Sequence, residues 1–233
     1  RQSSRVTPSQ LAADSVNKFF ARAPRLRMSA EMVRDNALTI SGLLSTKMHG
    51  PPIYPPQPGN IWRHVGRNAP KYIPATNEDR FRRGVYVVWR RGAPYVSFMN
   101  FDAPDRGACV VRRPRTNTPL QALTLLNDEA YVEMAMAFAG RILTEAKGTP
   151  EAKISYAYKT ALGRAPRATE TSYLKRLILK RLTYFEINPK DAADLIANTK
   201  GLKMPKEMDK GELAAWFYIA NILLNLDETI TKG

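Results

Sequence analysis

The sequence predicts a mainly α-helical protein, a helical bundle that includes a proline-rich irregular segment and one short β-hairpin. Apolar residues recur three and four positions apart in most segments of the second half, as on the buried face of a helix. Several of these segments start with Thr-Pro or Asn-Pro, which places a capping side chain before a proline in the first helical position. The chain has 233 residues and is 44% hydrophobic, a composition typical of a globular protein with a sizeable core.

Two helices are expected near the start of the chain, at residues 9–20 and 29–44. Each begins with a serine in the N-cap position, and the second carries apolar residues at helical spacing. Pro24 lies between the two segments and separates them.

The chain between residues 50 and 101 has no helical periodicity. In residues 50–74 the stretch GPPIYPPQPGNIW holds five prolines and two glycines, which predicts an extended segment pinned by Tyr54 and Trp62. Residues 85–91 and 95–101 are rich in β-branched and aromatic side chains and flank a Gly-Ala-Pro turn. This pattern predicts a short hairpin, with a single helical turn as the alternative.

The second half is predicted to be helical throughout. Thr118-Pro119 begins one helix and Thr149-Pro150 begins another, which Gly163 ends. Short connections between antiparallel helices then give a bundle. The helix that follows Thr149-Pro150 covers residues 151–162, and the remaining helices are predicted at residues 129–146, 169–184, 189–198 and 210–224. We interpret the chain as one continuous domain with an arginine-rich helical and irregular half, 1–117, and a helical-bundle half, 118–233.

Positive charge is concentrated in the first half. Residues 1–127 hold 17 arginines and three lysines against seven acidic residues, a net charge of +13 out of +15 for the chain. Residues 128–233 hold five arginines and 11 lysines against 14 acidic residues. Arginine is preferred over lysine where a planar fork must hold a carboxylate, a phosphate or a carbonyl. The first half is therefore expected to bind negatively charged groups, either of the protein itself or of an external partner.

The chain offers little for metal or thiol chemistry. Cys109 is the one cysteine, so it cannot form an internal disulfide, and with only His49 and His64 beside it no zinc site is expected. We expect Cys109 to be a buried structural thiol and the two histidines to be ordinary core or surface residues. No apolar run reaches the length of about 18 residues that a membrane span needs. Because the chain begins with Arg1, we expect a processed product or a piece of a longer protein.

The stretch FDAPDRGACVVRRPRTNTPLQALTLLND, residues 101–128, has three interpretations: a reactive centre, an anion-binding surface or a structural knot. Asp102 and Asp105 could serve as a general acid and base, with Arg113 beside them. Three residues apart in a DAPD turn, they more often cap the backbone around Pro104. We favour the knot, which joins the arginine-rich half to the helical half, and place a ligand site second.

Arginines interleaved with aromatic residues in RFRRGVYVVWRR also raise nucleic-acid binding, with Tyr86 and Trp89 as stacking side chains. No glycine-rich loop, zinc-finger spacing or helix-turn-helix pattern accompanies them. Arginines stack on aromatic rings inside ordinary folds as well. Nucleic acid therefore stays an alternative partner.

Five motifs occur in a recognisable order along the chain. They are RQSSR at the start, SAEMVRDNALTISGLLSTKMHGPP at 29–52, FRRGVYVVWRR at 81–91, the 101–128 stretch and the terminal LLNLDETITKG. Taken together they resemble a planctomycete and verrucomicrobial family of unknown function, whose domain follows cytochrome-c-like domains in long secreted proteins. The motif residues that match the family pattern are Arg34, Asp35, Gly42, Gly50, Pro51, Arg83, Tyr86, Arg90, Phe101, Asp102, Asp105, Cys109, Arg113, Thr116, Asn117, Thr118, Pro119, Gln121 and Asn127. Gly107 departs from it, because an acidic residue is usual there.

This resemblance implies a periplasmic or secreted protein in which haem c is bound upstream and this chain, the C-terminal part, holds no cofactor. We expect a non-catalytic or accessory module that binds an acidic partner domain, a redox protein or an anionic polysaccharide through its arginine-rich half. The alternatives are an enzyme that oxidises or hydrolyses polysaccharide and a nucleic-acid-binding protein. The candidate anion-binding or structural network is Arg34, Asp35, Arg83, Arg90, Asp102, Asp105, Arg112, Arg113, Arg115, Thr116, Asn117 and Gln121.

Overall fold

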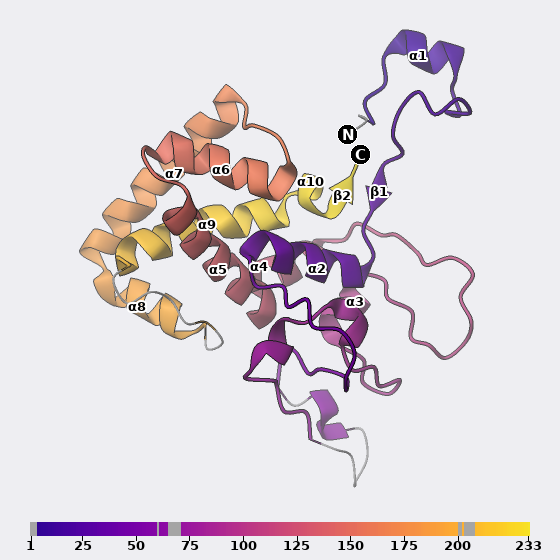
Figure 1. Ribbon diagram of the computed structural model, residues 1–233, viewed down its shortest axis with the longest axis horizontal. Coiled ribbons are helices and arrows are strands. Elements are labelled where there is room, and N and C mark those ends of the chain that lie inside the picture. Colours follow the sequence, from indigo (N-terminus) through magenta and orange to yellow (C-terminus); the bar gives the residue numbers. More distant parts are fainter. Residues whose placement is uncertain (1–3, 60, 65–70, 200–201, 203–207) are drawn as a thin grey trace.

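The structure is a computed structural model that describes residues 4–59, 61–64, 71–199, 202 and 208–233, and in residues 63 and 64 the backbone alone. It is mainly helical, as predicted (Figure 1). The helices of the first half are α1 Pro8–Ala13, α2 Ala30–Ser41 and α3 Val96–Asn100, with short 3-10 turns η1 Ile61–His64, η2 Glu78–Phe81 and η3 Gly84–Tyr86. The second half contains α4 Pro119–Asn127, α5 Glu129–Glu145, α6 Pro150–Leu162, α7 Ala168–Ile187, α8 Pro189–Ala197, α9 Lys210–Asn225 and α10 Asp227–Ile230.

The core is built around α5 and α9, which pack against each other, while α7 and α8 also pack on α9 (Figure 1). Met134 and Phe138 of α5 and Trp216 of α9 are almost fully buried. Helix α2 packs on α5 as well, and Val33 and Leu38 of α2 belong to the same hydrophobic cluster. The described residues of the two halves therefore share one continuous core.

The predicted helix starts of the second half are confirmed by their caps. The side chains of Thr118 and Thr149 accept hydrogen bonds from the backbone N–H three residues further on, and a proline follows each of them. Gly163 ends α6 in the left-handed conformation with φ of 71°. Helix α7 begins one residue earlier than predicted, because the Glu170 carboxylate accepts the Arg167 N–H and closes the first turn.

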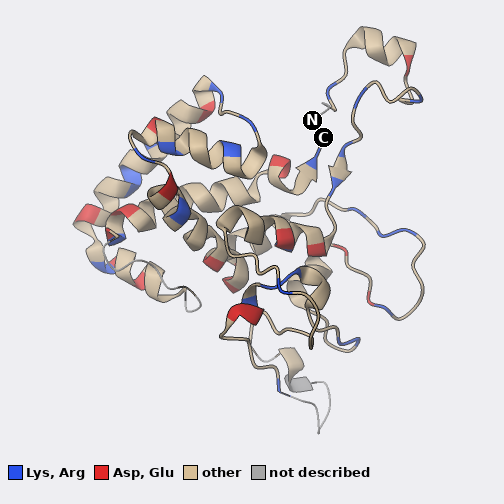
Figure 2. Ribbon diagram, viewed as in Figure 1, with Lys and Arg blue, Asp and Glu red and all other residues tan. Residues whose placement is uncertain are grey.

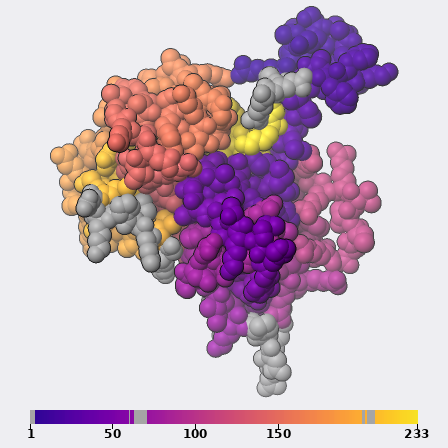
Figure 3. All heavy atoms as spheres, viewed as in Figure 1, coloured from indigo at the N-terminus to yellow at the C-terminus, as the bar shows by residue number. Residues whose placement is uncertain are grey.

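The first predicted helix is shorter than expected, since α1 ends at Ala13. The Asp14 carboxylate accepts hydrogen bonds from the backbone N–H groups of Lys18 and Phe19, and Asn17 is in the left-handed region with φ of 55°. These side-chain to backbone bonds compete with helix formation. Residues 14–25 instead form a turn and an extended arm that stands away from the body (Figure 3).

A two-stranded antiparallel pair is present, but it lies elsewhere than predicted. Strand β1, Leu26–Arg27, pairs with β2, Thr231–Lys232, so the start and the end of the described chain lie side by side (Figure 1). The hairpin predicted over residues 85–101 is wrong. Its first segment contains η3, and its second forms the helical turn α3, where Tyr95 and Phe98 are buried and pack edge to face. Burial of these rings on one face favours helical over alternating spacing.

The proline-rich segment is irregular over its described residues, apart from η1, and an aromatic cluster holds it. The rings of Tyr54, Trp62 and Tyr72 meet edge to face with centroids 5.1–6.0 Å apart. Trp62 Nε1 also donates to the carbonyl of Ala93, 3.0 Å away. Residues 60 and 65–70 of the predicted segment lie outside the described residues.

Residues 103–118, named here the arginine loop, connect the end of α3 to α4 without a helix or strand of their own (Figure 1). Residues 105–117 are all exposed. The loop carries four arginines and a single acidic residue, which gives it a net charge of +3 (Figure 2).

Candidate functional site

The deepest arginine contact joins the two halves. Arg80 is 5% exposed and Glu133, on α5, is 2% exposed. Arg80 donates from Nε and Nη2 to the two Glu133 carboxylate oxygens over 2.8 and 2.5 Å, and from Nη1 to the carbonyl of Ala75. Arg34 of α2 donates in turn to the Arg80 carbonyl over 2.7 Å. The two guanidinium groups thus bind two backbone carbonyls within the first half and the Glu133 carboxylate of the second half.

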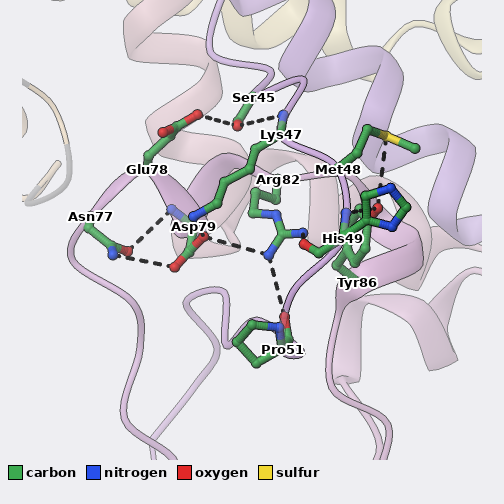
Figure 4. Close-up of polar contacts among 10 residues, drawn as sticks. All are labelled: Ser45, Lys47, Met48, His49, Pro51, Asn77, Glu78, Asp79, Arg82 and Tyr86. Atoms are coloured by element: carbon green, nitrogen blue, oxygen red, sulfur yellow. Dashed lines mark hydrogen bonds and ion pairs between the residues drawn. The ribbon is translucent and has the colours of Figure 1, made fainter.

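Arg82, which is 1% exposed, holds the turn that follows α2 (Figure 4). Its guanidinium donates to the carbonyls of His49 and Pro51 and lies 3.6 Å from the Asp79 carboxylate. The same group lies over the Tyr86 ring, 4.0 Å from its centroid. The Tyr86 hydroxyl accepts the His49 N–H over 2.9 Å. This cluster fixes backbone, and one face of the Tyr86 ring is covered by the protein's own arginine.

The predicted stacking residue Trp89 is also engaged within the chain. Its ring lies under the Arg106 guanidinium, with 4.6 Å between guanidinium and centroid, and Nε1 donates to the Asp105 carbonyl over 3.3 Å. Arg90, another predicted site residue, stacks on Trp62 at 5.0 Å. These arginine and aromatic pairs contribute about 0.5–1 kcal/mol each where they are exposed to solvent.

Helix α2 presents two carboxylates to arginines from other segments. Asp35 accepts the Gly84 N–H over 2.6 Å and lies 3.6 Å from Arg83 Nε. Glu31 accepts two hydrogen bonds from Arg113 of the arginine loop, at 3.0 and 2.8 Å. Burial acts to raise the pKa of Glu31, but the Arg113 guanidinium outweighs it, and the pKa lies below its ordinary value.

A chain of hydrogen bonds runs from the end of α3 to α10. The Asp102 carboxylate accepts the Thr116 N–H at 2.7 Å and contacts the Thr116 hydroxyl, which in turn accepts from the Gln121 amide at 3.0 Å. The Gln121 carbonyl oxygen accepts from Arg27 at 2.5 Å, and Arg27 also donates to Asp227 at 3.0 Å. The base of the arginine loop is therefore tied to the N-terminal strand and the C-terminal helix, as a structural knot would be.

Both predicted aspartates bind backbone N–H groups. Asp102 binds Thr116 across the loop, and Asp105 closes its own turn by accepting the Gly107 N–H at 2.9 Å. Asp102 and Arg106 are both in the left-handed region, with φ of 60° and 61°, so this turn is tightly bent. Capping is the role that the DAPD spacing favours.

A cleft of about 310 Å³ lies between the N-terminal strand and the arginine loop. We name it the arginine cleft; its lining residues are Leu26, Arg27, Met28, Ser29, Met32, Phe101, Asp102, Val111, Arg112, Arg113, Pro114, Arg115 and Gln121. Arg112 and Arg115 are exposed, and within the described residues neither forms a hydrogen bond, an ion pair or a ring contact. Arg113 retains 41% side-chain exposure beside Glu31. Two guanidinium groups and part of a third can thus receive an external anion.

The structure brings most of the sequence-predicted site residues together here. Asp102, Arg112, Arg113, Arg115 and Gln121 line the cleft. Thr116 and Asn117 contact lining residues, Asn117 through Arg27 at 3.4 Å. Five predicted residues lie elsewhere: Arg34, Asp35, Arg83, Arg90 and Asp105. Three arginines with the contacts described above, Arg27, Arg80 and Arg82, were not predicted as site residues.

The prediction that Cys109 is a buried structural thiol is wrong. Cys109 is exposed. It lies within residues 105–117 of the arginine loop, all of which are exposed to solvent. His49 is exposed as well, and the side chain of His64 lies outside the described residues.

Across the described part of the chain, no group of three or more His, Cys, Asp or Glu side chains is placed to hold a metal ion. Within the same residues, no helix combines the length and the apolar character needed to cross a membrane.

Residues 1–178 match the model of a protein family described as PSD1, protein of unknown function (DUF1553). The chain belongs to this family. The PSD1 match includes every residue that lines the arginine cleft, together with Arg80 and Glu133. Helix α9 and Asp227 lie after it. No curated protein and no solved structure matches the chain.

Proposed function

We propose that this PSD1 domain is a non-catalytic binding module that docks an acidic protein partner on its arginine loop. The observation that carries the proposal is the state of Arg112 and Arg115, which line a cleft, are exposed and form no ion pair among the described residues. Guanidinium forks pair with carboxylates in two-point geometry and are favoured at protein interfaces.

Internal contacts use part of the positive charge of the first half, and the arginine loop carries an exposed share of the remainder. Arg34, Arg80 and Arg82 are buried and hold carbonyls, carboxylates or a ring. Arg83 lies beside Asp35. The arginine loop has a net charge of +3, and its residues 105–117 are all exposed (Figure 2). One of its four arginines, Arg113, is paired with Glu31 of α2. Complementary charge of this kind mainly accelerates and orients an encounter.

The partner we propose is an upstream domain of the same parent protein or an acidic redox protein. This step relies on the resemblance described above, in which cytochrome-c-like domains precede the family domain in secreted proteins. In that setting haem c is bound by the upstream part, the compartment is the periplasm or the exterior, and this chain supplies the basic face of the contact.

The enzymatic alternative has less support. It requires Asp102, Asp105 and Arg113 to act on a polysaccharide in a cleft. Both aspartates accept backbone hydrogen bonds that shape the loop, and Arg113 is held by Glu31. A carboxylate that accepts backbone hydrogen bonds in a loop is poorly suited to acid–base catalysis, because a change in those bonds would also change the shape of the loop.

The test measures binding of a flexible, glutamate-rich peptide to the domain at several salt concentrations. We expect the double variant Arg112→Ala/Arg115→Ala to weaken binding at least tenfold and to reduce the salt dependence. The control is Lys180→Ala/Lys190→Ala, which removes two exposed charges from α7 and α8 and should change affinity less than twofold. Equal binding by both double variants would refute the proposal, as would binding of heparin or DNA oligomers with no binding of the peptide.

A further inference from the structure

We propose that the acidic partner enters the arginine cleft as an extended strand that pairs with the free edge of β1. This inference depends on the proposed function, because it specifies the form in which an acidic partner is bound. It follows from the hydrogen-bond register of β1, the position of the cleft and the residues that line it.

The register leaves one edge of β1 open. Met28 donates its N–H to the Ile230 carbonyl at 3.0 Å, and Arg27 lies opposite Thr231. In an antiparallel pair, residues alternate between those that exchange hydrogen bonds with the partner strand and those whose N–H and C=O point the other way. Arg27 is of the second kind. Among the described residues, its backbone N–H and C=O form no backbone hydrogen bond outside the β1–β2 pair.

The cleft adjoins β1. Leu26, Arg27, Met28 and Ser29 line it, as do residues 111–115 of the arginine loop. Figure 1 shows β2 on one side of β1 and the arginine loop on the opposite side. An unpaired strand edge is a template for a further strand, and peptides bind many domains in this way.

The lining favours an acidic strand with apolar residues between the acids. Met32 is 48% exposed and Val111 is fully exposed, so both offer apolar surface to a guest. Arg112 and Arg115 offer guanidinium groups beside them. Successive side chains of a strand point to opposite faces, so alternation of acidic and apolar residues satisfies both kinds of surface at once. A carbohydrate polyanion has no row of backbone N–H and C=O groups and so cannot continue the ladder of β1.

The probe for this inference is a short synthetic peptide in which Glu and Val alternate, acetylated and amidated at its ends. A matched probe has the same sequence but carries an N-methyl group on every backbone nitrogen, which removes all its backbone donors and keeps its charges. We expect the methylated probe to bind at least tenfold more weakly in fluorescence anisotropy. We also expect the unmethylated peptide to slow hydrogen exchange at the Arg27 amide at least fivefold.

The outcomes separate this inference from the proposed function. If both probes bind alike and Arg112→Ala/Arg115→Ala weakens both, docking of acidic chains stands and strand addition is refuted. If the double variant leaves binding of both probes unchanged, the docking proposal itself fails. If the peptide binds but the Arg27 amide exchanges as fast as in the free protein, the strand edge is not the site and the inference is overturned.

Discussion

Arg80 and Glu133 form a two-point ion pair in the interior, with Nε and Nη2 of the arginine 2.8 and 2.5 Å from the two carboxylate oxygens. Arg80 belongs to the first half of the chain and Glu133 to α5 of the second. Both side chains are almost fully buried. The pair fixes how η2 and the segment around it lie on the helical bundle, and its loss would leave a charge in the core.

We expect Glu133→Gln to lower the free energy of unfolding by about 3 kcal/mol, because Arg80 would stay buried with only the partly exposed Glu129 carboxylate, 3.3 Å away, as an acidic partner. Urea unfolding followed by circular dichroism measures this. The double variant Arg80→Met/Glu133→Leu should recover most of the loss, since it removes both charges and fills similar volume. Lys175→Gln, which breaks the surface contact to Glu151, is the control and should cost less than about 1 kcal/mol. A Glu133→Gln variant as stable as this control would contradict the prediction.

The arginine network shows where prediction from sequence ends. Helix starts were predictable because capping is local: Thr118, Thr149 and Gly163 act within four residues of themselves. Arg80 and Glu133 are 53 positions apart, and Arg82 binds carbonyls, which leave no trace in the side-chain pattern. Asp105 caps its own turn as predicted, whereas the Asp102 carboxylate binds Thr116, which lies 14 residues away. Whether Arg112 stays unpaired depends on the path of the whole loop.

The stability of the fold should depend on pH through Asp128, the N-cap of α5. Burial raises the pKa of this carboxyl to about 6, against a smaller opposing effect of its hydrogen bond from the Ala130 N–H. The folded state therefore holds the Asp128 proton more strongly than the unfolded state, whose value is 3.8. Stability is then lost as pH rises from about 4 to about 6, by up to about 3 kcal/mol.

We expect Asp128→Asn to remove this dependence, because Asn keeps the cap and cannot ionise. The free energy of unfolding of both proteins is measured with urea at pH 4 and pH 7. Subtracting the parent from the variant at each pH cancels the contribution of the other titrating groups. The variant should gain about 2–3 kcal/mol over the parent between these two pH values. An unchanged difference across the range would contradict the raised pKa.

Gly84 is expected to tolerate no side chain. A Cβ at this position would lie 3.0 Å from Glu31 Cα and 3.1 Å from the Glu31 carbonyl oxygen, both part of the α2 backbone. The Gly84 N–H also donates to Asp35 at 2.6 Å, so the segment cannot withdraw without breaking that bond. Gly84→Ala should destabilise by about 1–3 kcal/mol. Gly148→Ala is the comparison. A Cβ at Gly148 would have no neighbouring atom within 4 Å, but Gly148 has φ of 98°, so this variant measures backbone strain without a clash.

The order of the arginine loop should depend on the Thr116 hydroxyl, which contacts the Asp102 carboxylate and accepts from the Gln121 amide at 3.0 Å. Gln121 is 1% exposed, so Thr116→Val would leave a buried amide without this acceptor, at a cost of about 1 kcal/mol. Because Gln121 also holds Arg27 at the wall of the cleft, the loop and the strand edge should loosen together.

Hydrogen exchange over residues 111–117 measures the loosening, and we expect at least a fivefold acceleration with the rest of the fold unchanged. Affinity for the glutamate-rich peptide should fall as well, since a mobile loop loses more freedom on binding. Thr183→Val, at an exposed position of α7, is the matched control and should alter neither quantity. If Thr116→Val exchanges like the parent, the hydroxyl does not hold the loop, and the Thr116 N–H bond to Asp102 and the ion pair between Arg113 and Glu31 suffice to shape it.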